Sequence, residues 1–173
     1  MNTSQKIIQS LEDYVDTIYF VSGGGIAFIV DALGNSKINY IPMLCESGAV
    51  YSALGYAQAR KGLGVAIVTS GPGLSNSITG IASAWTDSIP LLVIGGTARR
   101  DTLINGTSLR THGIQEINGT AITHPITKCS IQAQSGTHAI NSLNVLIKLA
   151  LESRPGPVHL ELPLDIQSEE LND

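Results

Sequence analysis

The sequence predicts an α/β fold in which a six-stranded, mostly parallel sheet carries helices on both faces. Short apolar runs of strand length alternate with amphipathic segments of helix length along all 173 residues, and this alternation is typical of parallel strands joined by helices. Glycine-rich turns follow two of the apolar runs. No linker, repeat or low-complexity segment interrupts the pattern, so we expect a single domain over residues 1–173.

Each element is expected from its local pattern. The strands are short runs rich in β-branched and aromatic residues, bounded by turn residues. They occupy residues 17–21, 37–43, 65–68, 91–95, 126–131 and 157–162. The helices carry apolar side chains at helical spacing, and they occupy residues 6–14, 26–33, 50–60, 77–85 and 136–152. Segment 97–120 has no period, and so long a segment in a compact domain is more often functional or disordered than inert.

Three turns at the ends of strands are candidate ligand sites. Glu46 follows the second strand, the Gly71–Asn76 loop follows the third and leads into a helix that Asn76 opens, and a glycine turn at 22–25 follows the first. Parallel strands place their carboxyl ends at one edge of the sheet, where ligands bind. We therefore expect Glu46 and the Gly71–Asn76 loop to share a crevice. The glycine turn alone is more simply a tight connection, because no GxGxxG motif accompanies it.

Composition narrows the kinds of partner. Charged residues make up 14% of the chain and hydrophobic residues 43%, whereas about 25% charged residues is typical of soluble domains. This deficit favours burial of part of the surface against another chain, so we expect an oligomer. The net charge of -4 comes without a basic stripe, which argues against a nucleic-acid partner.

The cellular compartment is inferred from the apolar runs, the first residues and the cysteines of the sequence. No apolar run approaches the roughly 20 residues of a membrane span, and the first residues lack the apolar core of a signal peptide. Cys45 and Cys129 are too few for a disulfide framework and have no metal-ligand spacing. A reduced, cytoplasmic setting fits. We expect Cys45 to be a small buried side chain rather than a nucleophile.

Several motifs occur together in this sequence. They read ESGA at 46–49, TSGPGLSNSITGIA at 69–82, DSIPL at 87–91 and GPVHLELP at 156–163. Together they resemble the pyrimidine-binding, N-terminal domain of thiamine diphosphate-dependent enzymes, and most of all the acetolactate synthase-like group. The resemblance extends from residue 20 to residue 163 and implies the thiamine diphosphate-binding fold.

The resemblance implies a catalytic role for Glu46. In this family a glutamate hydrogen-bonds N1′ of the cofactor's aminopyrimidine and favours the imino tautomer, whose 4′-nitrogen removes the C2 proton. A largely apolar pocket would raise the pKa of Glu46 by disfavouring the charged carboxylate, and Met43, Leu44 and Ala49 lie beside it in sequence. The alternative reading is a solvated acid at a helix N-terminus, where a carboxylate is stabilised anyway.

Further site residues are implied in the same way. Glu46, Pro72, Gly73 and Asn76 would bind thiamine diphosphate, and Asn76 could also cap its helix. Ser22, Gly23 and Gln115 would lie on the substrate side. His112 and His124 are expected at the surface or between domains rather than in catalysis.

Departures from the family pattern leave the substrate open. The family's His-Glu-Gln-Gly is CESG at 45–48, its Gly-Tyr-Pro-Gly-Gly turn is VSGGG at 21–25, and Ile114 replaces an aromatic residue before Gln115. The sequence therefore does not select one 2-oxo acid or acceptor, does not choose between decarboxylation and carboligation, and does not say whether FAD binds.

The pyrophosphate half of the family's active site is absent from this chain. The family holds the diphosphate through a divalent metal bound by a Gly-Asp-Gly segment in a separate domain, and this sequence has no Gly-Asp-Gly. The resemblance thus implies that magnesium is held by a partner chain with the pyrophosphate-binding domain. The start at Met1 and the polar finish at Asp173 favour a natural subunit over an excised domain.

The expected function combines these points. The chain would be the pyrimidine-binding subunit of a split, cytoplasmic thiamine diphosphate enzyme, a lyase or transferase that acts on a 2-oxo acid within a hetero-oligomer. One alternative is a split 2-oxo acid decarboxylase of the sulfopyruvate or phosphonopyruvate type. The other is a non-catalytic interaction domain with the same fold.

Overall fold

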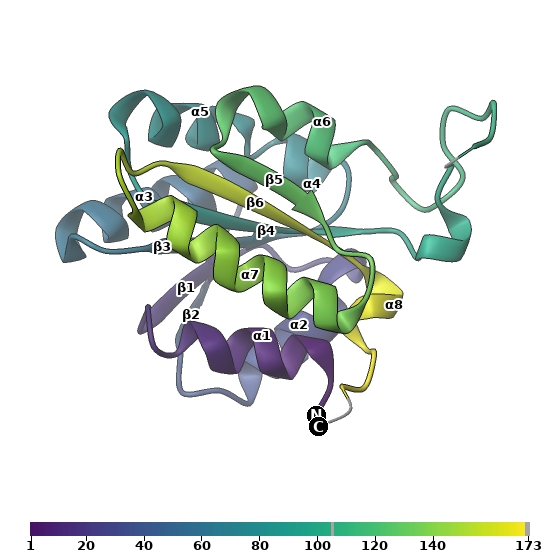
Figure 1. The fold of residues 1–173 in the computed structure, drawn as a ribbon, viewed down its shortest axis with the longest axis horizontal. Helices are drawn as coiled ribbons and strands as arrows, with labels where there is room; N and C mark the ends of the chain where they lie inside the picture. Colours follow the sequence, from purple (N-terminus) through teal and green to yellow (C-terminus); the bar gives the residue numbers. More distant parts are fainter. Residues whose placement is uncertain (105, 172–173) are drawn as a thin grey trace.

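The computed structural model describes residues 1–104 and 106–171, which form a six-stranded sheet with helices around it (Figure 1). The strand order is β2-β1-β3-β4-β6-β5, and all five strand pairings are parallel. The α/β fold class is confirmed, and the sheet is parallel throughout rather than mostly parallel. The strands are β1 Thr17–Phe20, β2 Asn39–Pro42, β3 Gly64–Val68, β4 Leu91–Thr97, β5 Cys129–Gln132 and β6 Pro157–Pro163.

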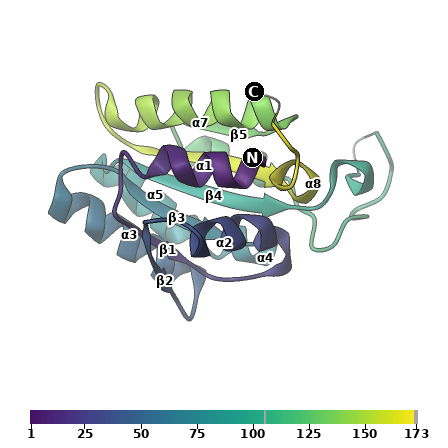
Figure 2. The same cartoon turned by 90° about the horizontal axis from the view of Figure 1, so that it is seen from below.

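Helices pack on the sheet in two layers (Figure 2). The α-helices are α1 Thr3–Leu11, α2 Ala27–Gly34, α3 Glu46–Arg60, α4 Pro72–Ser75, α5 Ile78–Asp87, α6 Gly119–Thr123, α7 Gly136–Leu151 and α8 Leu164–Gln167. Short 3-10 helices lie at Gly24–Ile26, Arg100–Thr102 and His124–Ile126. One core cluster joins α1, α2 and α7 to the sheet, and the other joins α3, α4 and α5 to its opposite face.

The central strands read as continuous apolar runs because both of their faces are buried. In β3, Val65 and Ile67 belong to the first core cluster, whereas Ala66 and Val68 belong to the second. Successive side chains of a strand point to opposite faces, so a strand covered by helices on both sides needs apolar residues at every position. The ends of these strands are thereby fixed in place by two packed layers.

The sheet edge formed by β2 is open. All four residues of β2 are exposed, and Tyr40 keeps 47% of its surface accessible. Among the described residues no further strand lies beside it, because β2 pairs with β1 alone. The expectation of helices on both faces is confirmed for the sheet, but these layers leave the four residues of β2 exposed.

Three expected elements have different bounds for identifiable reasons. The strand expected at 126–131 begins only at Cys129, since a 3-10 helix containing Pro125 follows α6 directly and occupies Ile126. The helix expected at 50–60 begins already at Glu46, so this acid lies in the first turn of α3 rather than in a preceding loop. The first helix likewise begins earlier, at Thr3, where Asn2 accepts the backbone N–H of Gln5 and forms a capping box.

Candidate functional site

The structure brings Glu46 and Asn76 together. Glu46 follows β2 at the start of α3, and Asn76 follows β3 and α4. Asn76 Nδ2 donates a hydrogen bond to Glu46 Oε2 at 2.6 Å. Two parallel strands therefore deliver side chains 30 residues apart in sequence to one edge of the sheet, as expected for an α/β site.

Asn76 does not open or cap the next helix. It is the C-cap residue that follows α4, and α5 begins at Ile78 with Ser77 at its N-cap position. The expectation that Asn76 begins this helix is wrong, because the Gly71 loop already closes into the short helix α4. The side-chain amide of Asn76 is thus directed to Glu46 instead of to a backbone N–H.

The loop geometry depends on two glycines and a proline. Gly71 has a φ of 58°, a conformation that glycine adopts without strain. Pro72 occupies the first turn of α4, where its fixed φ suits a helix and its missing N–H costs nothing. A methyl group on Gly73 would lie 2.7 Å from Thr69 Cγ2 and 3.5 Å from Glu46 Oε1. Gly73 therefore keeps the floor beside the Glu46 carboxylate open.

Thr69 joins the glycine turn after β1 to the Gly71–Asn76 loop, and no role was expected for its side chain from the sequence. Its Oγ1 accepts the backbone N–H of Gly25 at 3.2 Å. A methyl group on Gly23 would lie 2.5 Å from the same oxygen, so the turn of the first strand packs directly on Thr69. The available signal was its position directly after β3, at the start of the glycine loop. Ser22, by contrast, is exposed and makes none of these contacts.

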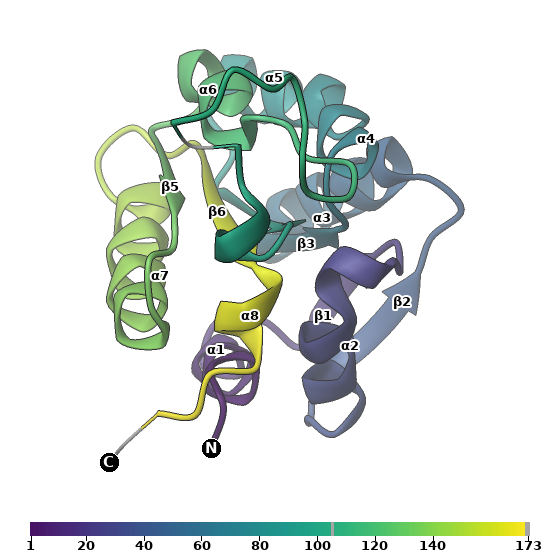
Figure 3. The ribbon, with the colours of Figure 1, turned by 90° about the vertical axis from the view of Figure 1, so that its right-hand side faces the viewer.

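Gln115 lies against the Gly71 turn and lines a cavity of about 350 Å³. The backbone of Gln115 has a φ of 55°, and its carbonyl group packs directly against Gly71. The cavity lies under the segment between β4 and α6, at the end of the sheet that Figure 3 views. Its lining residues include Gly24, Gly25, Ser70, Thr97, His112 and Gln115. His112 and His124 are both exposed, as expected.

The apolar surroundings expected for Glu46 are incomplete within this chain. Glu46 and Met43 are half-buried and Ala49 is fully buried, but Leu44 is 104% exposed. Leu44 follows the open edge strand β2, so nothing in the described residues packs over it. Glu46 Oε2 is bonded to Asn76, whereas no described residue forms a hydrogen bond with Oε1. One carboxylate oxygen thus remains available to a ligand.

Cys45 is exposed, so the expectation of a small buried side chain is wrong. It precedes α3 at the open edge, next to the exposed Leu44, and none of the described helices and strands buries it there. Hydrogen bonds from the Ser47 hydroxyl and from the Gly48 backbone lower the pKa of its thiol. The site edge of this chain therefore presents a thiol beside the Glu46 carboxylate.

Two buried ionisable side chains lie behind the site on β6. Burial lowers the pKa of His159 to about 3, and its Nδ1 lies 2.9 Å from Ser130 Oγ and 3.0 Å from Thr123 Oγ1. Burial raises the pKa of Glu161 to about 7, against the opposing effect of hydrogen bonds from Gln132 and from the backbone of Gly119. His159 is therefore neutral near pH 7, and Glu161 titrates there.

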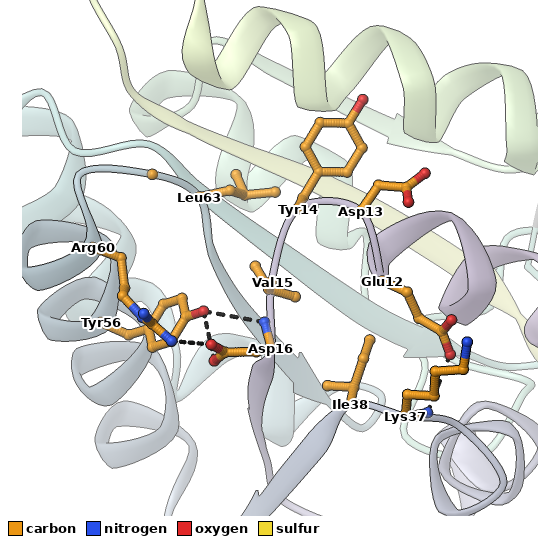
Figure 4. A pocket seen from close by; sticks show the side chains of 11 residues that line it. Glu12, Asp13, Tyr14, Val15, Asp16, Lys37, Ile38, Tyr56, Arg60 and Leu63 are labelled. Atoms are coloured by element: carbon orange, nitrogen blue, oxygen red, sulfur yellow. Dashed lines mark hydrogen bonds and ion pairs between the residues drawn. The ribbon is translucent and has the colours of Figure 1, made fainter.

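A separate depression of about 630 Å³ lies at the amino ends of the strands, away from the residues described above (Figure 4). Tyr56 Oη donates to Asp16 Oδ1 at 2.9 Å, and Arg60 forms an ion pair with Asp16. The Arg60 guanidinium also lies 5.7 Å from the centre of the Tyr56 ring. These polar groups bind one another across the depression, so they are not poised for a ligand.

Residues 1–104 and 106–171 contain no cluster of three or more His, Cys, Asp or Glu side chains that could hold a metal ion. Within the same ranges, no helix combines the length and the apolar character that a membrane crossing requires.

Comparison with known families identifies related proteins. The family model described as "Thiamine pyrophosphate enzyme, N-terminal TPP binding domain" matches residues 1–122. The acetolactate synthase large subunit of Lactococcus lactis subsp. lactis (strain IL1403) is 36% identical over 172 residues, which cover 98% of this chain and 29% of the relative.

Two further relatives give the same result. The acetolactate synthase large subunit of Corynebacterium glutamicum (strain ATCC 13032) is 34% identical over 174 residues, covering 99% of this chain and 27% of the relative. Acetolactate synthase isozyme 2 large subunit of Escherichia coli (strain K12) is 34% identical over 168 residues, with 96% and 30% covered. The chain thus spans less than a third of the length of these relatives.

Proposed function

Because this chain belongs to the thiamine pyrophosphate enzyme family, whose N-terminal TPP binding domain it matches, we propose that it supplies the pyrimidine-binding half of a thiamine diphosphate site. Residues 1–173 would form this one domain. The observation that carries the proposal is the pairing of Glu46 with Asn76 at 2.6 Å beside the open floor at Gly73.

The residues at this edge fit the aminopyrimidine ring. Glu46 Oε1 has no hydrogen bond from any described residue, and its partner oxygen is held by Asn76. Gly73 leaves space beside the carboxylate because it has no side chain, and a side chain at this position would press on Thr69. Glu46 would share a proton with N1′ of the pyrimidine through Oε1, while Asn76 fixes the orientation of the carboxylate. Pro72 would hold the Gly73 backbone against the ring.

The chemistry of the cofactor complements these residues. Thiamine diphosphate, when bound, would supply the electron sink for breaking the bond between the carboxylate and the carbonyl carbon of a 2-oxo acid. Glu46 provides a positioned acid/base group at N1′. Gln115 and the glycine turn containing Ser22 and Gly23 would border the substrate, since Gln115 and the adjacent Gly24 line the cavity of about 350 Å³.

The reaction would be of the acetolactate synthase type, decarboxylation followed by carboligation or protonation. Support comes from relatives named acetolactate synthase large subunit, which are 34% to 36% identical over nearly this whole chain. A decarboxylase of the sulfopyruvate or phosphonopyruvate type differs in the substrate and in the step after decarboxylation. Product analysis with pyruvate alone, and then with sulfopyruvate or phosphonopyruvate, separates these outcomes.

A partner would complete the site. The relatives are more than three times as long as the matched segment, and this sequence has no Gly-Asp-Gly. Magnesium and the diphosphate would be bound by a pyrophosphate-binding domain outside residues 1–173, and we propose that this domain belongs to another chain of a cytoplasmic hetero-oligomer. The fully exposed Leu44 and the open strand β2 lie next to Glu46 and would be covered by that partner. Burial of Leu44 would also give Glu46 the apolar surroundings that this chain lacks.

The test is Glu46→Gln in the assembled enzyme. Gln keeps the shape of the side chain but cannot share the proton, so the exchange of the C2 proton of bound thiamine diphosphate should slow by about 10²- to 10⁴-fold. Glu12→Gln is the matched control, since Glu12 also accepts one hydrogen bond, from the backbone N–H of Lys37 to Oε1 at 3.1 Å, far from the site. An unchanged exchange rate in Glu46→Gln would refute the assignment and leave a non-catalytic interaction domain.

A further inference from the structure

The segment between β4 and α6 is held by a buried carboxylate. Glu116 is 8% exposed, and its two oxygens accept three backbone N–H groups of the same segment. Ile104 N donates to Oε1 at 2.7 Å, while His112 N and Gly113 N donate to Oε2 at 3.2 and 3.1 Å. One side chain therefore joins the beginning and the end of this loop.

Among the described residues, only backbone N–H groups bind the carboxylate of Glu116. No Lys, Arg or His in ranges 1–104 and 106–171 lies within ion-pair distance of it. Hydrogen bonds to an ionised acceptor are stronger than those between neutral groups, and a buried carboxylate that loses them carries a large desolvation penalty. The loop conformation and the burial of Glu116 thus stabilise each other.

The same contacts set the backbone next to the candidate site. Gly113 packs on Ala98 so closely that a methyl group at Gly113 would overlap the Ala98 side chain. Gln115, the residue before Glu116, takes a left-handed φ of 55°, which is unfavourable for a residue with a side chain. Its carbonyl then presses on Gly71, the first residue of the turn that leads to Gly73. Anchoring by Glu116 compensates for this strained conformation.

We propose that Glu116 is a positioning residue that holds the backbone of Ile104, His112 and Gly113 in place beside the cavity and thereby fixes Gln115 against the Gly71 turn. The inference rests on the proposed function, because it assigns this loop to the substrate side of that site. Glu116 touches neither the pyrimidine position nor Glu46; it acts through the backbone of Gln115.

Glu116→Gln in the assembled enzyme tests the proposal. The amide of Gln can accept with one oxygen only, so its NH₂ group faces an N–H donor and the loop loses at least one anchor. Hydrogen exchange at the amides of Ile104, His112 and Gly113 should accelerate by about tenfold or more. With pyruvate as the probe, KM should rise by about tenfold or more, with the C2-proton exchange of bound cofactor within about twofold of wild type.

Gly113→Ala provides a second variant if Glu116→Gln does not fold. It displaces the same loop by steric overlap with Ala98 and leaves every charge in place. The same rise in KM is expected. Glu12→Gln removes a carboxylate that also accepts a backbone N–H, and it should change neither the loop exchange nor KM.

Failure of the inference and failure of the proposed function give different results. Unchanged amide exchange in Glu116→Gln, or a loosened loop with unaltered KM, overturns the role of Glu116 while Glu46→Gln still slows C2 exchange. Normal C2 exchange in Glu46→Gln overturns the proposed function instead. If the wild-type enzyme does not turn over pyruvate, the assigned reaction fails, and amide exchange still decides whether Glu116 anchors the loop.

Discussion

Replacing Glu161 by Gln should change how the stability of the fold depends on pH. Burial on β6 raises the pKa of Glu161 from 4.5 to about 7. Between these values the folded chain binds a proton that the unfolded chain has released, so stability falls as pH rises through this window. One proton is worth about 1.4 kcal/mol per pH unit, which gives roughly 3 kcal/mol across the window. Gln cannot titrate, so this loss should vanish in the variant.

His159 affects the pH dependence of stability in the opposite direction to Glu161. Burial lowers its pKa from 6.5 to about 3, so between these values the unfolded chain binds a proton that the folded chain does not. Its contribution to stability is fully present above pH 6.5 and is lost as pH falls toward 3. From pH 4.5 to pH 6.5 the effects of His159 and Glu161 therefore nearly cancel, because each shifts by about one proton in opposite directions.

Urea unfolding of the wild type, Glu161→Gln and His159→Asn at several values between pH 4.5 and pH 6.5 measures these slopes. Relative to wild type, Glu161→Gln should gain about 3 kcal/mol across the window as pH rises, and His159→Asn should lose about the same. The slope is the readout, since each variant also shifts the absolute stability through packing and lost hydrogen bonds. Groups common to all three chains cancel in the differences. Parallel curves would refute the assignment of buried, titrating side chains to β6.

Two further predictions concern the partner and the site floor. The isolated chain should bind thiamine diphosphate with magnesium weakly or not at all in calorimetry, and should sediment as an oligomer once the partner is added; tight binding alone, or a persistent monomer, would contradict the two-chain reading. Gly73→Ala places a methyl group 2.7 Å from Thr69 Cγ2 and should lower stability by about 1–3 kcal/mol and weaken cofactor binding in the assembled enzyme. A methyl group on Gly55 would meet no atom within 4 Å outside its chain neighbours and its own helix backbone, so Gly55→Ala should not destabilise the chain. Equal free energies of unfolding for Gly73→Ala and Gly55→Ala would refute the steric argument.

The sequence by itself determined the alternation of strands and helices and the meeting of Glu46 with the Gly71–Asn76 loop. Both follow from local rules, because apolar periodicity decides element type and parallel strands end at one edge. All six expected strands are present. Among the element bounds that differ from the expected ones, β5 begins later because a 3-10 helix containing Pro125 precedes it, and α3 begins earlier, at Glu46. Gly71 was identifiable as a turn residue for the same reason, since its positive φ favours glycine.

Only the tertiary structure decided which surfaces are covered. The apolar run at β2 reads like the buried strands, yet its place at the edge of the sheet leaves Leu44 and Cys45 exposed. The contact of Thr69 with Gly23 joins two different turns, and the anchoring of Ile104 by Glu116 joins the two ends of one long loop. Such contacts depend on strand order and loop path, which are set by the packing of the whole chain, and no local pattern in the sequence encodes them.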